Sequence, residues 1–225
     1  IRLADDLKVK FPDKEFVPVY WMATEDHDFA EINHTKLSGK KIAWDTPAVS
    51  ATGRMDTASI VDAVKQYNGV LGLSENSCKL TRIIEDAYLK HTNLADATRY
   101  MVHELFKKFG LVIIDADDEQ LKAVFKPIIA DDILNEKSFK AIEKTSQELE
   151  EAGFATQVHA REINFFYLTD DYRERIVLND DGRYEVLHQD LYFTRAELEQ
   201  EIDLHPERFS PNVVMRPMYQ EIILP

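Results

Sequence analysis

The chain has 225 residues, 44% of them hydrophobic and 30% charged, with a formal net charge of −14 at pH 7. These fractions predict a folded globular domain, and the negative charge argues against nucleic-acid binding, which needs a basic surface. The single cysteine, Cys78, excludes an intrachain disulfide and favours a cytoplasmic location, and no apolar run approaches the roughly 20 residues of a membrane span, so no membrane partner is expected.

The amino-terminal residues predict a helix followed by a core strand. Apolar side chains recur at helical spacing over residues 1–10. Residues 16–22 are predicted to form a buried strand, because Val17, Val19 and Trp21 have the β-branched and aromatic character of a sheet core.

Ionisable residues follow this strand at Glu25, Asp26, His27 and Asp28. In open α/β sheets, ligands bind just outside the carboxyl ends of strands. A neighbouring carboxylate can orient an imidazole and fix its tautomer, so His27 is a candidate general base or substrate clamp. The alternative is an acidic helix N-terminus favoured by the helix dipole. We favour a functional role because the run follows a core strand.

An aspartate of this run can also cap a short helix over residues 29–34. On such a helix His34 lies seven residues after His27 and could face the same side. A metal site made by His27, Asp28 and His34 matches no standard zinc spacing, so no metal is predicted. A hairpin around Gly39 is expected next, over residues 35–44.

The middle of the chain predicts helices separated by a polar loop. In that loop Gly53 and Arg54 could offer N–H groups and a guanidinium to a carboxylate or phosphate, with a surface turn as the equal alternative. Helical periodicity predicts helices over 60–67, 79–90 and 94–109, the last of which ends at Gly110.

Residues 111–114 form the second apolar strand pattern, and Asp115 begins another acidic run after it. Asp115 is therefore either a site residue at a second strand end or a helix cap. The order helix, glycine, strand, acidic loop and helix is typical of a βαβ unit. The predicted fold is α/β: a Rossmann-like doubly wound parallel sheet with helical and small antiparallel β insertions.

The second half predicts two helices and then an antiparallel block. The expected helices are 118–134 and 135–151, the expected strands are 162–168, 173–178 and 184–187, and a further helix at 195–203 has a capping box from Thr194 and Glu197. We expect a core at 1–155, an insertion at 156–190 and a return to the core at 191–225. Because the chain starts at Ile1 and ends on an apolar run, we also expect it to be a fragment of a longer protein.

Ser210, Pro211 and Asn212 are predicted to open the last helix, with Arg216 inside it. Free N–H groups at a helix N-terminus together with an arginine can bind an anion. The alternative is ordinary N-capping, since proline is favoured at the first helical position.

Several segments resemble the amino-terminal part of a known family. The most specific are FVPVYW at 16–21, EDHDF at 25–29, EINH at 31–34 and FSPNVVMRP at 209–217. Supporting segments are GLVIID at 110–115, NFFY at 164–167 and RERI at 173–176. The family is BshC, the cysteine ligases of bacillithiol biosynthesis.

The resemblance implies a Rossmann-like core with inserted connecting segments, and a ligase that adds L-cysteine to glucosaminyl malate in the last step of bacillithiol biosynthesis. ATP or ADP is the candidate cofactor, although the His-x-Gly-His and Lys-Met-Ser-Lys-Ser signatures of distantly similar nucleotidyltransferases are absent. The resemblance also implies a homodimer formed through a coiled coil beyond this chain.

The hypothesis for catalysis is that His27, aided by Asp26 or Asp28, orients or deprotonates the attacking cysteine amine. Arg54 and Arg216, together with the N-terminus of the predicted last helix at Asn212, would hold the carboxylates of malate or an anionic activating group. The candidate substrate-binding residues are Glu25, Asn33, His34, Arg54, Asp115, Ser210, Asn212 and Arg216. Two alternatives are a non-catalytic module that binds a nucleotide or sugar acid, and a metal-dependent hydrolase.

Overall fold

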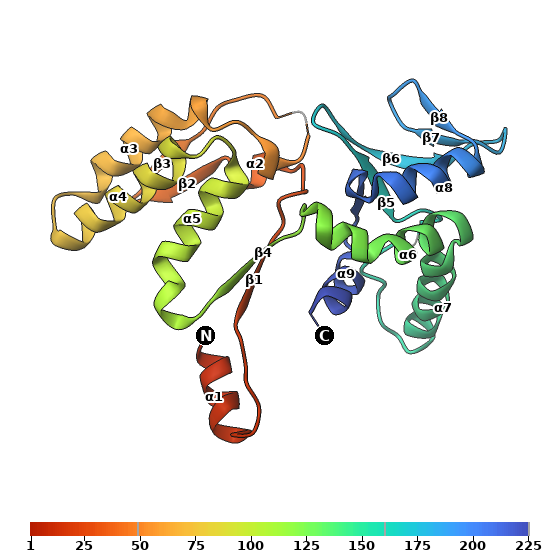
Figure 1. The fold of residues 1–225 in the computed structure, drawn as a ribbon, viewed down its shortest axis with the longest axis horizontal. Coiled ribbons are helices and arrows are strands. Elements are labelled where there is room, and N and C mark those ends of the chain that lie inside the picture. Colours follow the sequence, from red (N-terminus) through yellow and green to blue (C-terminus); the bar gives the residue numbers. More distant parts are fainter. Residues whose placement is uncertain (49, 160, 225) are drawn as a thin grey trace. The chain divides into compact units, whose positions relative to one another are not determined.

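The computed structural model describes residues 1–48, 50–159 and 161–224. The chain divides into two compact units, Ile1–Ala116 and Asp117–Pro225, and each unit has its own strands and helices (Figure 1). Among the described residues, no helix combines the length and the apolar character needed to cross a membrane.

The first unit combines two short strand pairs with α-helices (Figure 1). Its helices are α1 (Arg2–Lys10), α2 (Phe29–Ile32), α3 (Val61–Leu71), α4 (Glu75–Lys90) and α5 (Leu94–Phe106). Its strands are β1 (Val19–Met22), β2 (His34–Leu37), β3 (Lys40–Ala43) and β4 (Val112–Asp115). The predicted amino-terminal helix and the three helices of the middle region are confirmed, with ends shifted by a few residues.

The strands β1 and β4 form the parallel pair that the two acidic strand ends predicted. Val19 lies opposite Val112, and Met22 lies opposite Asp115. The predicted burial is wrong, because Val17 is 59% exposed and Val19 is 37% exposed, while Met22 is buried. Parallel sheets are normally covered on both faces. Within the described residues this sheet has only two strands, so the predicted doubly wound sheet is not confirmed.

The β2–β3 hairpin is confirmed, with Leu37 paired to Lys40. Ser38 and Gly39 in its turn have φ angles of 49° and 78°. A two-residue turn of type I′ needs positive φ at both positions, which glycine adopts without steric cost. The helix predicted over 29–34 is shorter than expected, because α2 ends at Ile32 and β2 already begins at His34.

Local capping signals explain where the helices of this unit begin and end. The Ser74 side chain accepts a hydrogen bond from Ser77 N at the start of α4, and Asn93 does the same for Asp96 N at the start of α5. After α5, a 3₁₀ turn over Lys107–Phe109 ends at Gly110, which is left-handed with φ of 68°. These helices pack on one apolar cluster, built from Phe29, Trp44, Ile60 and Val64 with Ile84, Tyr88 and Leu94 against it.

The second unit is built around an antiparallel sheet with the strand order β8-β7-β6-β5-β9 (Figure 1). Its strands are β5 (Phe165–Leu168), β6 (Arg173–Leu178), β7 (Tyr184–Val186), β8 (Leu191–Phe193) and β9 (Phe209–Pro211). Its helices are α6 (Glu119–Asn135), α7 (Lys137–Glu151), α8 (Arg195–Leu204) and α9 (Arg216–Ile223). In the core, Phe125 of α6 stacks on Tyr219 of α9 with ring centroids 4.6 Å apart.

The predicted strands β5, β6 and β7, the turn at 179–182 and the capping box of α8 are all confirmed. The prediction that residues 210–212 open the last helix is wrong. Ser210 and Pro211 belong to β9, and α9 begins only at Arg216. The strands β8 and β9 were not predicted, and two of the three residues of β9 were expected to open a helix instead. As a result, the sheet draws strands from both sides of the expected boundary at residue 190.

Candidate functional site

The carboxyl ends of β1 and β4 are joined by side chains as well as by backbone. Thr24, which follows β1, donates from its hydroxyl to the carboxylate of Asp115 at the end of β4. Ala116 N also donates to Met22 O at 3.3 Å. The two acidic strand ends therefore meet, as predicted, although Thr24 and Asp115 are 91 residues apart in the sequence.

Arg99 of α5 holds the end of β4 in place. Its guanidinium donates to the backbone oxygen of Ile113 at 3.3 Å and to the Asp115 carboxylate at 3.4 Å. The carboxylate of Asp115 thus contacts both Thr24 and Arg99, and its side chain is only 15% exposed. These contacts give Asp115 a role in positioning the strand end, and its predicted role in substrate binding stays a prediction.

The loop at Gly53 packs directly on the loop that follows β1. Gly53 N donates to Thr24 O at 2.7 Å, and Thr52 N donates to Asp26 O at 2.7 Å. A Cβ atom at Gly53 would lie 2.5 Å from Thr24 Cβ and 2.8 Å from Thr24 O, so only glycine permits this approach. The N–H of Gly53 is therefore used within the protein, which argues against its predicted role beside Arg54 in anion binding.

The acidic run after β1 separates into buried and exposed side chains. Glu25 is only 2% exposed. One Asp26 carboxylate oxygen accepts from His27 N at 2.8 Å and from Asp28 N at 3.4 Å, which organises a tight turn. The His27 side chain is 53% exposed, and its Nδ1 lies 3.6 Å from the same Asp26 oxygen. The predicted role of Asp26 in orienting His27 stays a prediction.

The geometry of α2 corrects two predictions about this region. Asp28 occupies the N-cap position, but its side chain makes no capping hydrogen bond. His34 lies in a strand rather than on a helix shared with His27, and its Nδ1 is 2.9 Å from the Asn33 side-chain oxygen. Within the described ranges, no group of three or more His, Cys, Asp or Glu side chains could hold a metal ion. The ligand set of the hydrolase alternative, His27, Asp28 and His34, is therefore not formed.

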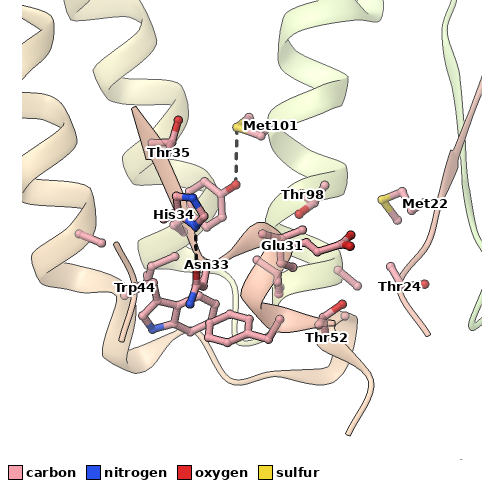
Figure 2. A pocket seen from close by; sticks show the side chains of 18 of the residues that line it. Met22, Thr24, Glu31, Asn33, His34, Thr35, Trp44, Thr52, Thr98 and Met101 are labelled. Carbon is pink, nitrogen blue, oxygen red and sulfur yellow. Dashed lines mark hydrogen bonds between the residues drawn. The ribbon is translucent and has the colours of Figure 1, made fainter. Parts of the chain in front are cut away.

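A pocket of about 580 Å³ opens beside this loop, and Figure 2 shows many of its side chains. Its lining comes from β1, α2, the β2–β3 hairpin, the 3₁₀ turn after the hairpin and the helices α3, α4 and α5. The predicted site residues that line it are Asp26, Asp28, Asn33 and His34. The predicted residues of the same unit that are not part of its lining are Glu25, His27, Arg54 and Asp115.

Tyr88 contributes a partly buried phenol to the wall of this pocket. Its hydroxyl lies 3.8 Å from Met101 Sδ, as drawn in Figure 2, and it is hydrogen-bonded to the Thr98 side chain. Burial raises the pKa of the Tyr88 phenol, with smaller contributions from Tyr20 and Tyr67, and the Thr98 hydrogen bond opposes the rise. The phenol is therefore neutral near pH 7.

In the second unit, Ser210 belongs to a buried polar contact within the sheet. Its hydroxyl accepts from Arg173 Nε at 3.0 Å, and the same guanidinium donates to Pro211 O at 3.3 Å. The guanidinium also lies 3.8 Å from the centre of the Phe166 ring. Ser210 is fully buried. These contacts fasten β9 to the sheet and give Ser210 a structural role.

Asn212 belongs to a second polar network, which links β5 to α6. Its amide nitrogen donates to the Asn164 side-chain oxygen at 2.9 Å, and its oxygen accepts from Val214 N at 2.8 Å. Asn164 in turn donates from its backbone and side-chain nitrogens to the Asp132 carboxylate at 2.7 and 3.2 Å. Burial raises the pKa of Asp132, and the hydrogen bonds from Asn164 and Ser138 oppose this. Since α9 starts four residues later at Arg216, the predicted anion site at its N-terminus is not formed as expected.

A family model described as "Bacillithiol biosynthesis BshC, N-terminal Rossmann-like domain" matches residues 1–225. The chain belongs to this BshC domain family. The resemblance found in the sequence motifs is thus confirmed over the whole chain.

Relatives named "Putative cysteine ligase BshC" support the same assignment. The relative from Flavobacterium johnsoniae is 47% identical over 225 residues, covering 100% of this chain and 42% of the relative. The relative from Flavobacterium psychrophilum is 44% identical over the same length, and one from Staphylococcus carnosus is 29% identical over 220 residues. The chain spans less than half the length of these BshC proteins.

Sequence reasoning missed several residues of this candidate site. Glu31, Trp44, Tyr88 and Thr98 line the pocket, and Arg99 holds the strand end beside it. Only Glu31 had a usable signal, since it lies one helical turn after Asp28 within the EDHDF and EINH segments. The others come from helices and a hairpin whose packing on α2 no local pattern predicts.

Proposed function

We propose that this chain forms part of the active site of a ligase that joins L-cysteine to glucosaminyl malate. The observation that carries this proposal is the BshC family match over residues 1–225, together with a pocket beside the loop that contains the most specific motif. The related proteins carry the cysteine ligase name and are more than twice as long as this chain. The activity is therefore proposed for the whole protein.

The chemistry specifies which groups the site must handle. The new bond joins the carboxyl carbon of cysteine to a nitrogen, so the nucleophile in this proposal is the amino group of glucosaminyl malate rather than the cysteine amine. An amine attacks in its neutral form, so its ammonium must first give a proton to a base. Amide formation releases water overall, so the cysteine carboxyl must be activated by a co-reactant, for which ATP is the candidate.

His27 is the proposed base, with Asp26 as the group that orients it. The Nδ1 of His27 lies 3.6 Å from the Asp26 carboxylate, and Asp26 and Asp28 line the pocket. Because His27 itself is not part of the lining, the reacting amine would have to lie at the mouth of the pocket, next to this turn.

The residues that line the pocket do not fit the phosphate groups of ATP. The acidic side chains of Asp26, Asp28 and Glu31 line it, and neither lysine nor arginine is among the described lining residues. Phosphate groups are usually held by arginine, lysine or backbone N–H groups. We therefore assign no pocket residue to ATP. Arg54 and Arg216 belong to different units, and their predicted roles in binding anions stay predictions.

The test is product formation by the full-length protein supplied with glucosaminyl malate, cysteine and ATP, followed by mass spectrometry. We expect His27→Ala to lower the rate by about 100-fold, the lower range for removal of a general base. His103→Ala is the matched control, since this histidine is exposed on α5 and does not line the pocket. Wild-type rates from His27→Ala would remove His27 from the mechanism, and the absence of product from the wild-type protein would contradict the ligase itself.

The second candidate is a non-catalytic module that binds a small molecule. The observation that favours it is the position of His27, which is exposed and not part of the pocket lining. Calorimetry that shows tight substrate binding, together with no product in the same preparation, would support the module over the ligase. The homodimer and the cytoplasmic location stay predictions for the whole protein.

A further inference from the structure

The pocket of the first unit has the size and wall chemistry of a small-molecule site. Its volume of about 580 Å³ falls within the range of about 300–1,000 Å³ that is usual for such sites. Its lining includes the apolar cluster of Phe29, Trp44, Ile60 and Val64. All of its lining residues belong to the first unit, so its shape is defined within that unit.

The charge of the pocket lining is one-sided. Asp26, Asp28 and Glu31 supply carboxylates, and the described lining contains no lysine or arginine to balance them. An anionic ligand would be repelled by these groups, whereas a cation would be attracted. The negative charge of the lining therefore favours binding of the nitrogen-bearing part of a substrate over binding of a dicarboxylate.

Two of these carboxylates are free to bind a ligand. The Asp26 side chain is used by the turn, since it accepts from His27 N and Asp28 N. The side chains of Asp28 and Glu31 make no hydrogen bond or ion pair with any other described residue. Figure 2 shows Glu31 reaching from α2 toward the side of the pocket formed by Thr98, Met22 and Thr24.

Aromatic rings add to the preference for a cation. Phe29 and Trp44 pack edge to face at 5.1 Å, and together with Tyr88 they line the pocket. The negative face of an aromatic ring attracts an ammonium group that lies over it. The pocket lining therefore combines carboxylates with aromatic and aliphatic side chains.

We propose that this pocket binds a primary ammonium group of the substrate, and that Glu31 and Asp28 determine this specificity. The inference rests on the proposed ligase function for the choice of substrates. Both substrates of that reaction carry an amine, so the shared chemistry is the ammonium group, and its source is either the amino sugar or the amino acid. The malate end of the sugar substrate lies outside the pocket.

The test measures binding to the full-length protein by calorimetry, with D-glucosamine and L-cysteine as separate probes and their N-acetyl derivatives as uncharged-nitrogen controls. We expect at least one amine to bind and its N-acetyl form to bind more weakly. Glu31→Gln should weaken binding of that amine by about fivefold, as for an exposed ion pair, and the double variant Asp28→Asn/Glu31→Gln by about tenfold. Added salt should weaken binding to the wild-type protein through screening.

Asp45→Asn is the matched control, because Asp45 is exposed next to Trp44 but does not line the pocket. It should change affinity by less than about twofold. Unchanged amine affinity in the double variant, with native circular dichroism, would overturn the inference, as would tighter binding of malate than of either amine. The ligase assay decides the proposed function separately. If the protein forms product but its amine binding does not depend on Glu31, only this inference is rejected. If amine binding depends on Glu31 but no product forms, only the ligase function is rejected.

Discussion

Carboxylates in the two units of this molecule have opposite surroundings. In the second unit, Asp132 is fully buried and accepts hydrogen bonds from the backbone and side-chain nitrogens of Asn164. At the pocket of the first unit, Asp28 and Glu31 are exposed and have no partner among the described residues. A buried carboxylate needs internal partners, whereas one at a pocket mouth can remain available to a ligand. Whether a carboxylate contributes to stability or is available to a ligand therefore depends on whether it has a partner within the protein, and the sequence alone does not show this.

The largest effect is expected from Asp132→Ala. The change leaves the buried backbone nitrogen of Asn164 without its acceptor and its side-chain nitrogen with Arg161 O alone, so we expect the free energy of unfolding to fall by about 3 kcal/mol. Urea denaturation of the full-length protein measures this. Asp131→Ala is the matched control on the same helix, where an exposed ion pair with Lys137 is lost, and its effect should be much smaller. Equal losses from both variants would contradict the comparison.

The next effect is expected from Gly53→Ala in the first unit. The added Cβ would lie 2.8 Å from Thr24 O, a backbone atom that cannot move alone, so we expect a loss of about 2–3 kcal/mol and weaker amine binding. Gly69→Ala in α3 is the control, because its Cβ would meet nothing within 4 Å. That variant should instead stabilise the helix by about 0.5–1 kcal/mol. A tolerated Gly53→Ala would mean that the two loops are not packed as described.

A smaller effect is expected from Thr24→Val, which keeps the side-chain shape but removes the hydrogen bond to Asp115. The expected loss in the free energy of unfolding is about 1–2 kcal/mol, because the lost bond has a charged acceptor that Arg99 still contacts. Thr46→Val serves as the control, since no hydrogen bond of its side chain to a described residue is present. If both threonine variants unfold at the same urea concentration, the link between the strand ends contributes nothing measurable.

The smallest effect is expected at an exposed carboxylate with partners, Glu197 in the capping box of α8. Hydrogen bonds from the N–H and hydroxyl of Thr194 lower the pKa of Glu197 below its usual 4.5. The ionised form is therefore favoured by folding, so its contribution to stability is present above pH 4.5 and is lost as the pH falls through the lower folded pKa. The stability difference between the wild-type protein and Glu197→Gln should shrink between pH 7 and pH 3. A stability difference that stays constant over this pH range would contradict this prediction.

Local features of this fold were predictable from the sequence, whereas features that depend on long-range contacts were not. The capping box at Thr194, the turn around Gly39 and the helix end at Gly110 were predicted, because each depends on residues only a few positions apart. The start of the last helix was predicted wrongly. Ser210, which looked like an N-cap, is instead held in a strand by Arg173, 37 residues earlier.

The candidate site was only partly predictable for the same reason. The acidic run at 25–28 and the family motifs pointed to the correct loop, and Asp26 and Asp28 do line the pocket. The sequence could not show that Glu25 is buried, that His27 is not part of the lining, or that Glu31 reaches into the pocket.

By itself, the sequence determined the longer helices, the capping box of α8, the β2–β3 turn, the pairing of two apolar strands that each end in acidic residues, and membership in the BshC family. Only the tertiary structure decided what each acidic side chain meets. Thr24 and Asp115 are brought together over 91 residues of chain, and the pocket is assembled from β1, α2, a hairpin and three later helices. Helical periodicity and capping are interactions within one or two turns, whereas a pocket depends on contacts between distant segments. Features that depend on short-range interactions were therefore predictable from the sequence, and features that depend on long-range contacts were decided by the tertiary structure.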